Sequence, residues 1–81
     1  MPTEKQTRPL NVIAAEIRQD WKNLSPYAKP YLDAMSTLKS VHDNYLLDSG
    51  KSIVLYFLAN ASGWRGETAK RIKGELNQLI K

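Results

Sequence analysis

The pattern of apolar and polar positions predicts that most of the chain is helical. Apolar residues recur every three or four positions from Leu10 to Leu24, which is the spacing of one helix face, and Asn11 is placed to cap this first helix. A second apolar stripe runs from Tyr27 to Val41 and ends at the turn-forming pair Asp43-Asn44. Two amphipathic helices are therefore expected in the first half of the chain.

The start of the second helix is marked by Ser25-Pro26. Serine can accept hydrogen bonds from the first N–H groups of a helix, and proline loses no bond in the first turn. Pro30 lies one turn further along, where a proline would remove a hydrogen bond. Either the first turn is irregular or the helix begins nearer Ala28.

The third predicted helix, from about Gly50 to Ala61, is the most apolar segment of the chain. The stretch "NYLLDSG" before it reads as a loop, and Asp48 or Ser49 can cap the helix. The stretch "SIVLYFLANA" is apolar on nearly every side, which is typical of a helix in the centre of a domain, although a buried strand has the same composition. A helix is preferred because its neighbours are helical.

The fourth predicted helix follows a break at Ser62-Gly63, where Gly63 suits the left-handed residue that closes a helix and Trp64 can fold back on Leu58 or Ala59. Its expected buried stripe consists of Ala69, Ile72, Leu76, Leu79 and Ile80. On the opposite face lie Lys70, Lys73, Asn77 and Lys81. Arg71 stands four residues from both Glu67 and Glu75, a spacing that suits exposed ion pairs.

These elements predict an all-α fold, a small single-domain bundle of about four helices with the hydrophobic helix 50–61 at its centre. Residues 1–9 are polar and contain two prolines, so a flexible tail is expected ahead of a single helical domain at residues 10–81. Most of the core is expected to come from Ile17, Trp21, Leu32, Met35, Ile53, Leu55, Phe57, Leu58, Ile72, Leu76 and Leu79.

Composition narrows the possible functions. The 81 residues include no cysteine and one histidine, His42, which excludes disulfides, thiolate metal sites and a histidine-rich metal site. A single core of this size gives only a few kcal/mol of net stability, so a homodimer is a reasonable expectation. The longest apolar run is too short to span a bilayer and the N-terminus is charged, so we expect a cytoplasmic protein with no membrane partner.

Catalytic signatures are weak. Gly50-Lys51-Ser52 matches the end of a phosphate-binding loop, but Tyr45 stands where that loop needs its first glycine, and the expected strand is absent from the sequence pattern. The triplet is therefore interpreted as a capped helix start. His42 beside Asp43 is typical of a solvated turn, and Asp43 and Asp48 are typical turn or cap residues. We expect no enzyme, no catalytic residue and no cofactor.

Positive charge is concentrated in the last quarter of the chain. Residues 63–81 hold five Lys or Arg and two Glu, which gives +3 of the total +4. In "LYFLANASGWRGETAKRIKG", residues 55–74, Ala59 precedes Gly63 by four positions and apolar residues flank the turn. This segment resembles the DNA-binding helix-turn-helix family. The resemblance implies nucleic-acid contacts from helix four at Arg65, Lys70, Arg71 and Lys73, and a flexible basic arm at Lys5 and Arg8.

The run "SIVLYFLANASGWRGETAKRIK" also resembles small uncharacterised proteins of bacterial phages and other mobile elements, which implies either DNA or one host protein as the partner. The first hypothesis is a small non-enzymatic nucleic-acid-binding protein. The alternative is an interaction or inhibitor module that binds a host protein through exposed aromatic residues. The candidate anchors are Tyr27, Tyr45, Tyr56 and Trp64. An exposed Trp64 would favour the alternative, and a buried Trp64 would favour the helix-turn-helix interpretation.

Overall fold

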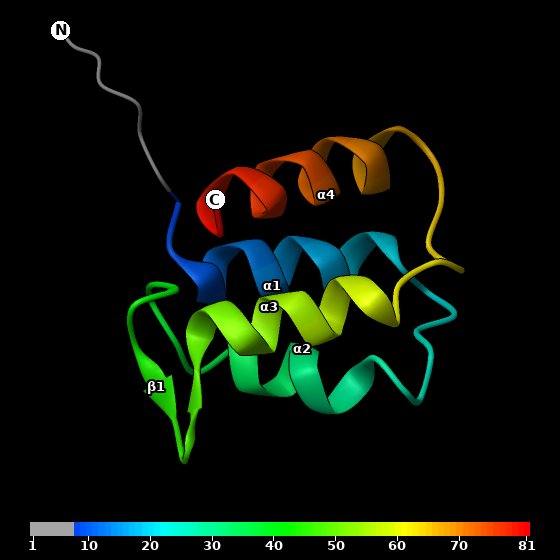
Figure 1. Cartoon of the computed structure of the whole chain (residues 1–81). Coiled ribbons are helices and arrows are strands. Elements are labelled where there is room, and N and C mark those ends of the chain that lie inside the picture. Colours follow the sequence, from blue (N-terminus) through cyan, green and yellow to red (C-terminus); the bar gives the residue numbers. More distant parts are fainter. Residues whose placement is uncertain (1–7) are drawn as a thin grey trace, which may run out of the picture.

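The computed structural model describes residues 8–81, which form four helices and one small β-hairpin (Figure 1). The helices are α1 (Leu10–Asp20), α2 (Lys29–Met35), α3 (Gly50–Ala59) and α4 (Glu67–Leu79), and the hairpin strands are β1 (Asn44–Tyr45) and β2 (Asp48–Ser49). The predicted small all-α bundle is confirmed. Within the described residues, no helix has the length and apolar character needed to cross a membrane.

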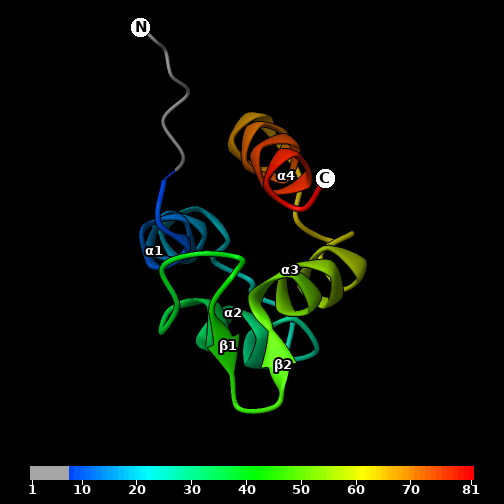
Figure 2. The same ribbon diagram turned by 60° about the vertical axis from the view of Figure 1, so that its left-hand side comes forward.

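The helices surround a shared core. Contacts join α1 to α2, α2 to α3, α3 to α4 and α4 back to α1, and Figure 2 shows this ring obliquely from one end. The buried face of α3 consists of Ile53, Val54 and Phe57 and points into the core. Because α1 and α4 supply an apolar stripe each, the four helices bury their faces against one another.

Three aromatic side chains fill the part of the core near the C-terminal ends of α1 and α3. Trp21 and Trp64 are stacked with ring centroids 5.7 Å apart, and Phe57 meets both rings edge-on at 6.2 and 6.4 Å. Trp64 is 2% exposed, and its indole Nε1 donates a hydrogen bond to Asp20 Oδ2 at 2.8 Å. Such stacked and edge-on pairs are favourable beyond the area that they bury.

The predicted core is largely correct. Eight of its eleven members are buried, and Leu58 and Leu79 are partly buried against the same cluster. Leu55 is the error, because it lies on the outward face of α3 and is 47% exposed. The sequence shows apolar residues all around this helix, and the structure buries only one of its faces.

The second helix is shorter than predicted, because α2 begins at Lys29 with Pro30 in its first turn and ends at Met35. The later start near Ala28 is thus confirmed. The predicted stripe continued to Val41, but the chain after Met35 forms turns. The hydroxyls of Ser36 and Thr37 donate to Leu32 O and Ala34 O, a local side-chain bonding that competes with helix continuation.

The turn after α2 also provides hydrogen-bond acceptors for the first N–H groups of α1. The N–H groups of Leu10 and Asn11 donate to the carbonyl oxygens of Lys39 and Leu38 at 3.0 and 2.9 Å. The helix begins at Leu10 with Pro9 at the cap position, so the prediction of Asn11 as cap is wrong. A side-chain cap is not needed here because backbone carbonyls already satisfy these N–H groups.

The predicted loop before α3 contains the β-hairpin, in which Asn44 pairs with Ser49 and Tyr45 with Asp48. The side chain of Ser49 then caps α3 by accepting the N–H of Ser52 at 3.1 Å. The interpretation of Gly50-Lys51-Ser52 as a capped helix start is therefore confirmed.

The connection between α3 and α4 differs from the prediction at its glycines. Gly66, which immediately precedes α4, has a φ of 111°, whereas Gly63 does not have a positive φ. The prediction that Gly63 closes the third helix in a left-handed conformation is therefore wrong, and the positive φ belongs to the residue that caps the start of α4. Helix α3 ends at Ala59, and the chain turns between Ala61 and Trp64 through a hydrogen bond from Trp64 N–H to Ala61 O at 3.0 Å.

Candidate functional site

Part of the basic face predicted on the fourth helix is engaged in contacts within the domain. Arg71 is the first example. Its guanidinium pairs with Glu16 of α1, so the predicted pairs with Glu67 and Glu75 within the helix are wrong. Glu75 instead accepts Arg8 at 2.7 Å, and Arg8 also reaches Glu16 at 2.8 Å. Two arginines and two glutamates thus join α4 to α1 and to Arg8, which lies two residues before α1.

The ion pairs of this network favour the charged forms of Glu16 and Arg8. Hydrogen bonds from Arg71 and Arg8 lower the pKa of Glu16 below its usual value, and the hydrogen bond to Glu75 raises the pKa of Arg8. The positive charges of Arg71 and Arg8 are therefore directed at carboxylates within the domain. Lys5, the other residue of the expected basic arm, lies outside the described residues.

Lys73 is also engaged. Its ammonium donates to the carbonyl oxygen of Trp64 at 2.7 Å and lies 5.9 Å from the centroid of the Trp64 ring. These contacts hold the connection between α3 and α4 against the helix that follows. Arg65 and Lys70 are exposed, and within residues 8–81 neither forms an ion pair with a carboxylate.

The arrangement of α3 and α4 differs from that of a helix-turn-helix. The two helices run in opposite directions (Figures 1 and 2), and residues 60–66 connect them, a longer link than the usual turn of three or four residues. Ala59 is exposed, and a Cβ at Gly63 would meet nothing within 4 Å. Trp64 is buried, as the motif interpretation expected, but its partners are Trp21 and Phe57.

The predicted aromatic anchors fall into two groups. Tyr27 is 75% exposed and Tyr56 is 49% exposed, whereas Tyr45 is partly buried against the core and Trp64 is enclosed. Tyr31 of α2 was not predicted as a binding residue. Its ring lies 5.4 Å from that of Tyr56 between centroids, so two tyrosines from neighbouring helices form one pair.

A surface that we call the α2–α3 face surrounds this pair. It consists of Tyr31 from α2 and of Ser52, Leu55, Tyr56 and Ala59 from the outward side of α3. Across Gly50–Ala59 the sole charged residue is Lys51, in the first turn. The sequence signal for this face was the all-round apolar character of the helix, which we interpreted as central burial.

His42 and Asp43 lie in the turn between α2 and the β-hairpin. His42 is exposed, and the Asp43 carboxylate accepts the N–H groups of Lys39 and Ser40 at 3.0 and 3.2 Å, which confirms Asp43 as a turn residue. Among residues 8–81 no three potential metal ligands come together.

Comparisons with known proteins identify no relative of this chain. The chain matches no protein-family model, no curated protein and no solved structure. Two exposed surfaces of the described residues are the candidate sites, the α2–α3 face and the pair Arg65 and Lys70.

Proposed function

We propose that this protein is an interaction module that binds a partner protein through the α2–α3 face. The observation that carries the proposal is the exposure of Leu55 and Tyr56 on a helix whose outward side bears no charge beyond Lys51. Surface helices normally place charged residues towards solvent. An exposed apolar surface of this kind is typical of an interaction site.

The tyrosine pair suits the role of an anchor. Tyrosine is enriched at the few interface residues that dominate binding energy, and it loses little conformational entropy on binding. The contact between Tyr31 and Tyr56 restricts both rings before any partner arrives. The entropic cost of binding is lowered by such preorganisation.

The charges around the face indicate the chemistry of the partner. Lys51 lies at the N-terminal end of α3, while Lys29 of α2 is neutralised by Asp33 at 3.0 Å. The partner surface should therefore be apolar at its centre, with a carboxylate placed to meet Lys51. The positive net charge of the chain favours such a partner through electrostatic complementarity.

Photo-crosslinking in cells that produce the protein tests this proposal. With a photoreactive phenylalanine analogue at position 56, we expect one partner protein to crosslink, and the additional change Leu55→Glu should abolish the product. Against that purified partner, Tyr56→Ala should lower the affinity at least about tenfold. Val12→Ala is the matched control, because Val12 is similarly exposed but lies on α1. Equal crosslinking from position 12 would contradict the proposal.

Nucleic-acid binding is a second candidate function. The observation that favours it is the exposure of Arg65 and Lys70 beside the start of α4, without an ion-pair partner among the described residues. Arginine can bind guanine edges with two hydrogen bonds, and lysine can neutralise a phosphate. Arg71 and Lys73 complete the predicted set only if they leave Glu16 and the Trp64 carbonyl.

Fluorescence anisotropy of labelled duplex DNA at low and near-physiological salt tests this second function. If Arg65 and Lys70 bind phosphates, the affinity should fall as the salt concentration rises. The slope of log affinity against log salt concentration should correspond to roughly two phosphate contacts, and Arg65→Glu/Lys70→Glu should abolish binding. Lys51→Glu, at the opposite end of the molecule, is the charge-matched control for the single change Lys70→Glu, because each reverses one lysine. The absence of binding at low salt would exclude this function for duplex DNA.

A further inference from the structure

The tip of the β-hairpin is apolar and exposed. Leu46 and Leu47 form the two-residue turn between β1 and β2; Leu46 is 84% exposed and Leu47 is fully exposed. Such turns favour Asn-Gly or other pairs with glycine. Leu46 has a φ of 57°, a left-handed conformation that is unfavourable for leucine. Neither side chain stabilises the described fold, so both are available for a contact outside the chain.

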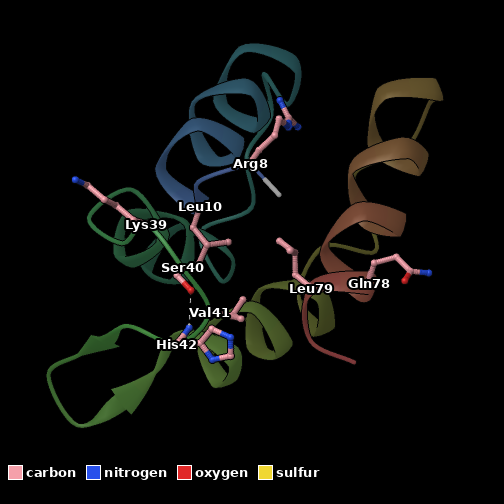
Figure 3. A pocket seen from close by; sticks show the side chains of 8 residues that line it. All are labelled: Arg8, Leu10, Lys39, Ser40, Val41, His42, Gln78 and Leu79. Atoms are coloured by element: carbon pink, nitrogen blue, oxygen red, sulfur yellow. Dashed lines mark hydrogen bonds between the residues drawn. The ribbon is translucent and has the colours of Figure 1, made fainter. Parts of the chain in front are cut away.

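A cavity of about 240 Å³ lies at the same end of the molecule. Figure 3 shows the side chains of Leu10, Val41 and Leu79 converging on it from the start of α1, the turn after α2 and the end of α4. The rim is formed by Arg8, Lys39, Ser40, His42 and Gln78. An apolar cavity of about 150 Å³ can hold a benzene molecule, so this one can admit a leucine side chain.

We propose that two copies of this chain form a dimer in which each inserts its Leu46-Leu47 tip into the cavity of the other. Strand β1 begins two residues after His42, which lies on the cavity rim. The hairpin lies at the same end of the fold as the start of α1, the turn after α2 and the end of α4 (Figure 1), the segments that supply the cavity lining. A single two-fold axis at this end therefore makes both contacts at once, which closes the assembly at two copies.

The charges next to these features support a second copy as the occupant. Asp48 follows the tip and is exposed, and Lys39 extends outward from the cavity rim. In the dimer, Asp48 of each copy meets Lys39 of the other, so the contact contains two opposite-charge pairs. These pairs offset the repulsion between two chains of net charge +4. Arg8 adds little positive charge here because Glu16 and Glu75 already pair with it.

The dimer adds to the proposed function without depending on it. The α2–α3 face shares no residue with the cavity lining or with the hairpin tip, so both surfaces can be occupied at the same time. A dimer would therefore present two such faces. Burial of two leucines per copy would also add apolar contact to a domain whose own core is small.

Sedimentation of the full-length chain over a range of concentrations tests the dimer. We expect the wild type to be dimeric and Leu46→Gly/Leu47→Asn to be monomeric at the same concentrations. Because the positive φ of this turn falls at position 46, where hairpin turns with one such residue favour glycine, this variant should keep the fold, with a melting temperature at high dilution no lower than that of the wild type. A monomeric wild type at every concentration, or a dimeric variant, would overturn the proposal.

A charge exchange tests the geometry of the contact. Asp48→Lys and Lys39→Asp should each raise the dimer dissociation constant at least about tenfold, because each places like charges together twice. An equimolar mixture of the two variants should restore the dimer, since both contacts then join opposite charges. Tyr56→Ser should leave dimerisation unchanged, which separates this result from the function of the α2–α3 face. A mixture that stays monomeric would overturn the reciprocal arrangement.

Discussion

Replacing Trp64 with alanine should remove a large share of the protein's free energy of unfolding. Removing a buried tryptophan costs about 3–5 kcal/mol, and a domain of 81 residues has a free energy of unfolding of roughly 4–12 kcal/mol. Trp64 is enclosed by the core, stacks on Trp21 and contacts the edge of Phe57. The substitution removes the burial and both ring contacts together, so its cost should fall in the upper part of that range.

Urea unfolding followed by far-ultraviolet circular dichroism measures this effect. Trp64→Phe should lie between the wild type and Trp64→Ala, because it keeps an aromatic ring but loses the hydrogen bond to Asp20. Tyr27→Ala is the control for removing an aromatic side chain, and at its exposed position we expect a change within about 0.5 kcal/mol. A loss of less than about 1 kcal/mol in Trp64→Ala would contradict a core built around the aromatic cluster.

Hydrophobic periodicity predicted the buried faces of the helices well, because it reports a local property of each segment. Ala69, Ile72 and Leu76 are buried as the stripe on the fourth helix requires. Trp64 lies in a connection with no periodicity, so the sequence could not show whether the indole is enclosed. Its burial depends on Trp21 and Phe57, which come from α1 and α3.

The pairing of Arg71 shows how tertiary contacts override local spacing. Glu67 and Glu75 stand at helical spacing from this arginine, but an exposed pair of this type contributes only about 0.3–0.5 kcal/mol. The fold places Glu16 of α1 within reach, where Arg8 also binds it. Residue spacing within one helix carries no information about a carboxylate 55 positions earlier in the chain.

Only part of the candidate site was predicted from the sequence, because the rest depends on how the helices pack. Tyr27 and Tyr56 were selected from the sequence as aromatic residues, and both are exposed. Leu55 was placed in the core, because a helix that is apolar on all sides has the same sequence whether it lies in the centre of a domain or carries a binding face. The role of Tyr31 depends on the packing of α2 against α3, which the sequence pattern does not specify.

Gly50→Ala should destabilise the protein by about 1–3 kcal/mol or more, the cost of forcing an extra methyl group into a packed site. A Cβ at this position would lie 2.8 Å from the carbonyl oxygen of Ser40 and 2.9 Å from Cα of Val41. Both are backbone atoms, so they cannot rotate away. The same turn holds the start of α3 through hydrogen bonds from Gly50 N–H to Asp43 O at 2.7 Å and from Lys51 N–H to Val41 O at 3.0 Å.

Gly74→Ala provides the matched control, because it makes the same chemical change at a second helical glycine. A Cβ at Gly74 would meet nothing within 4 Å, and the residue is exposed in the interior of α4. Alanine is favoured over glycine in a helix by about 1 kcal/mol, so this variant should be stabilised. The two substitutions should therefore shift the urea midpoint in opposite directions. If Gly50→Ala were also stabilising, α3 would not pack against the backbone of residues 40–41. The close approach of that backbone would then not explain why position 50 is a glycine.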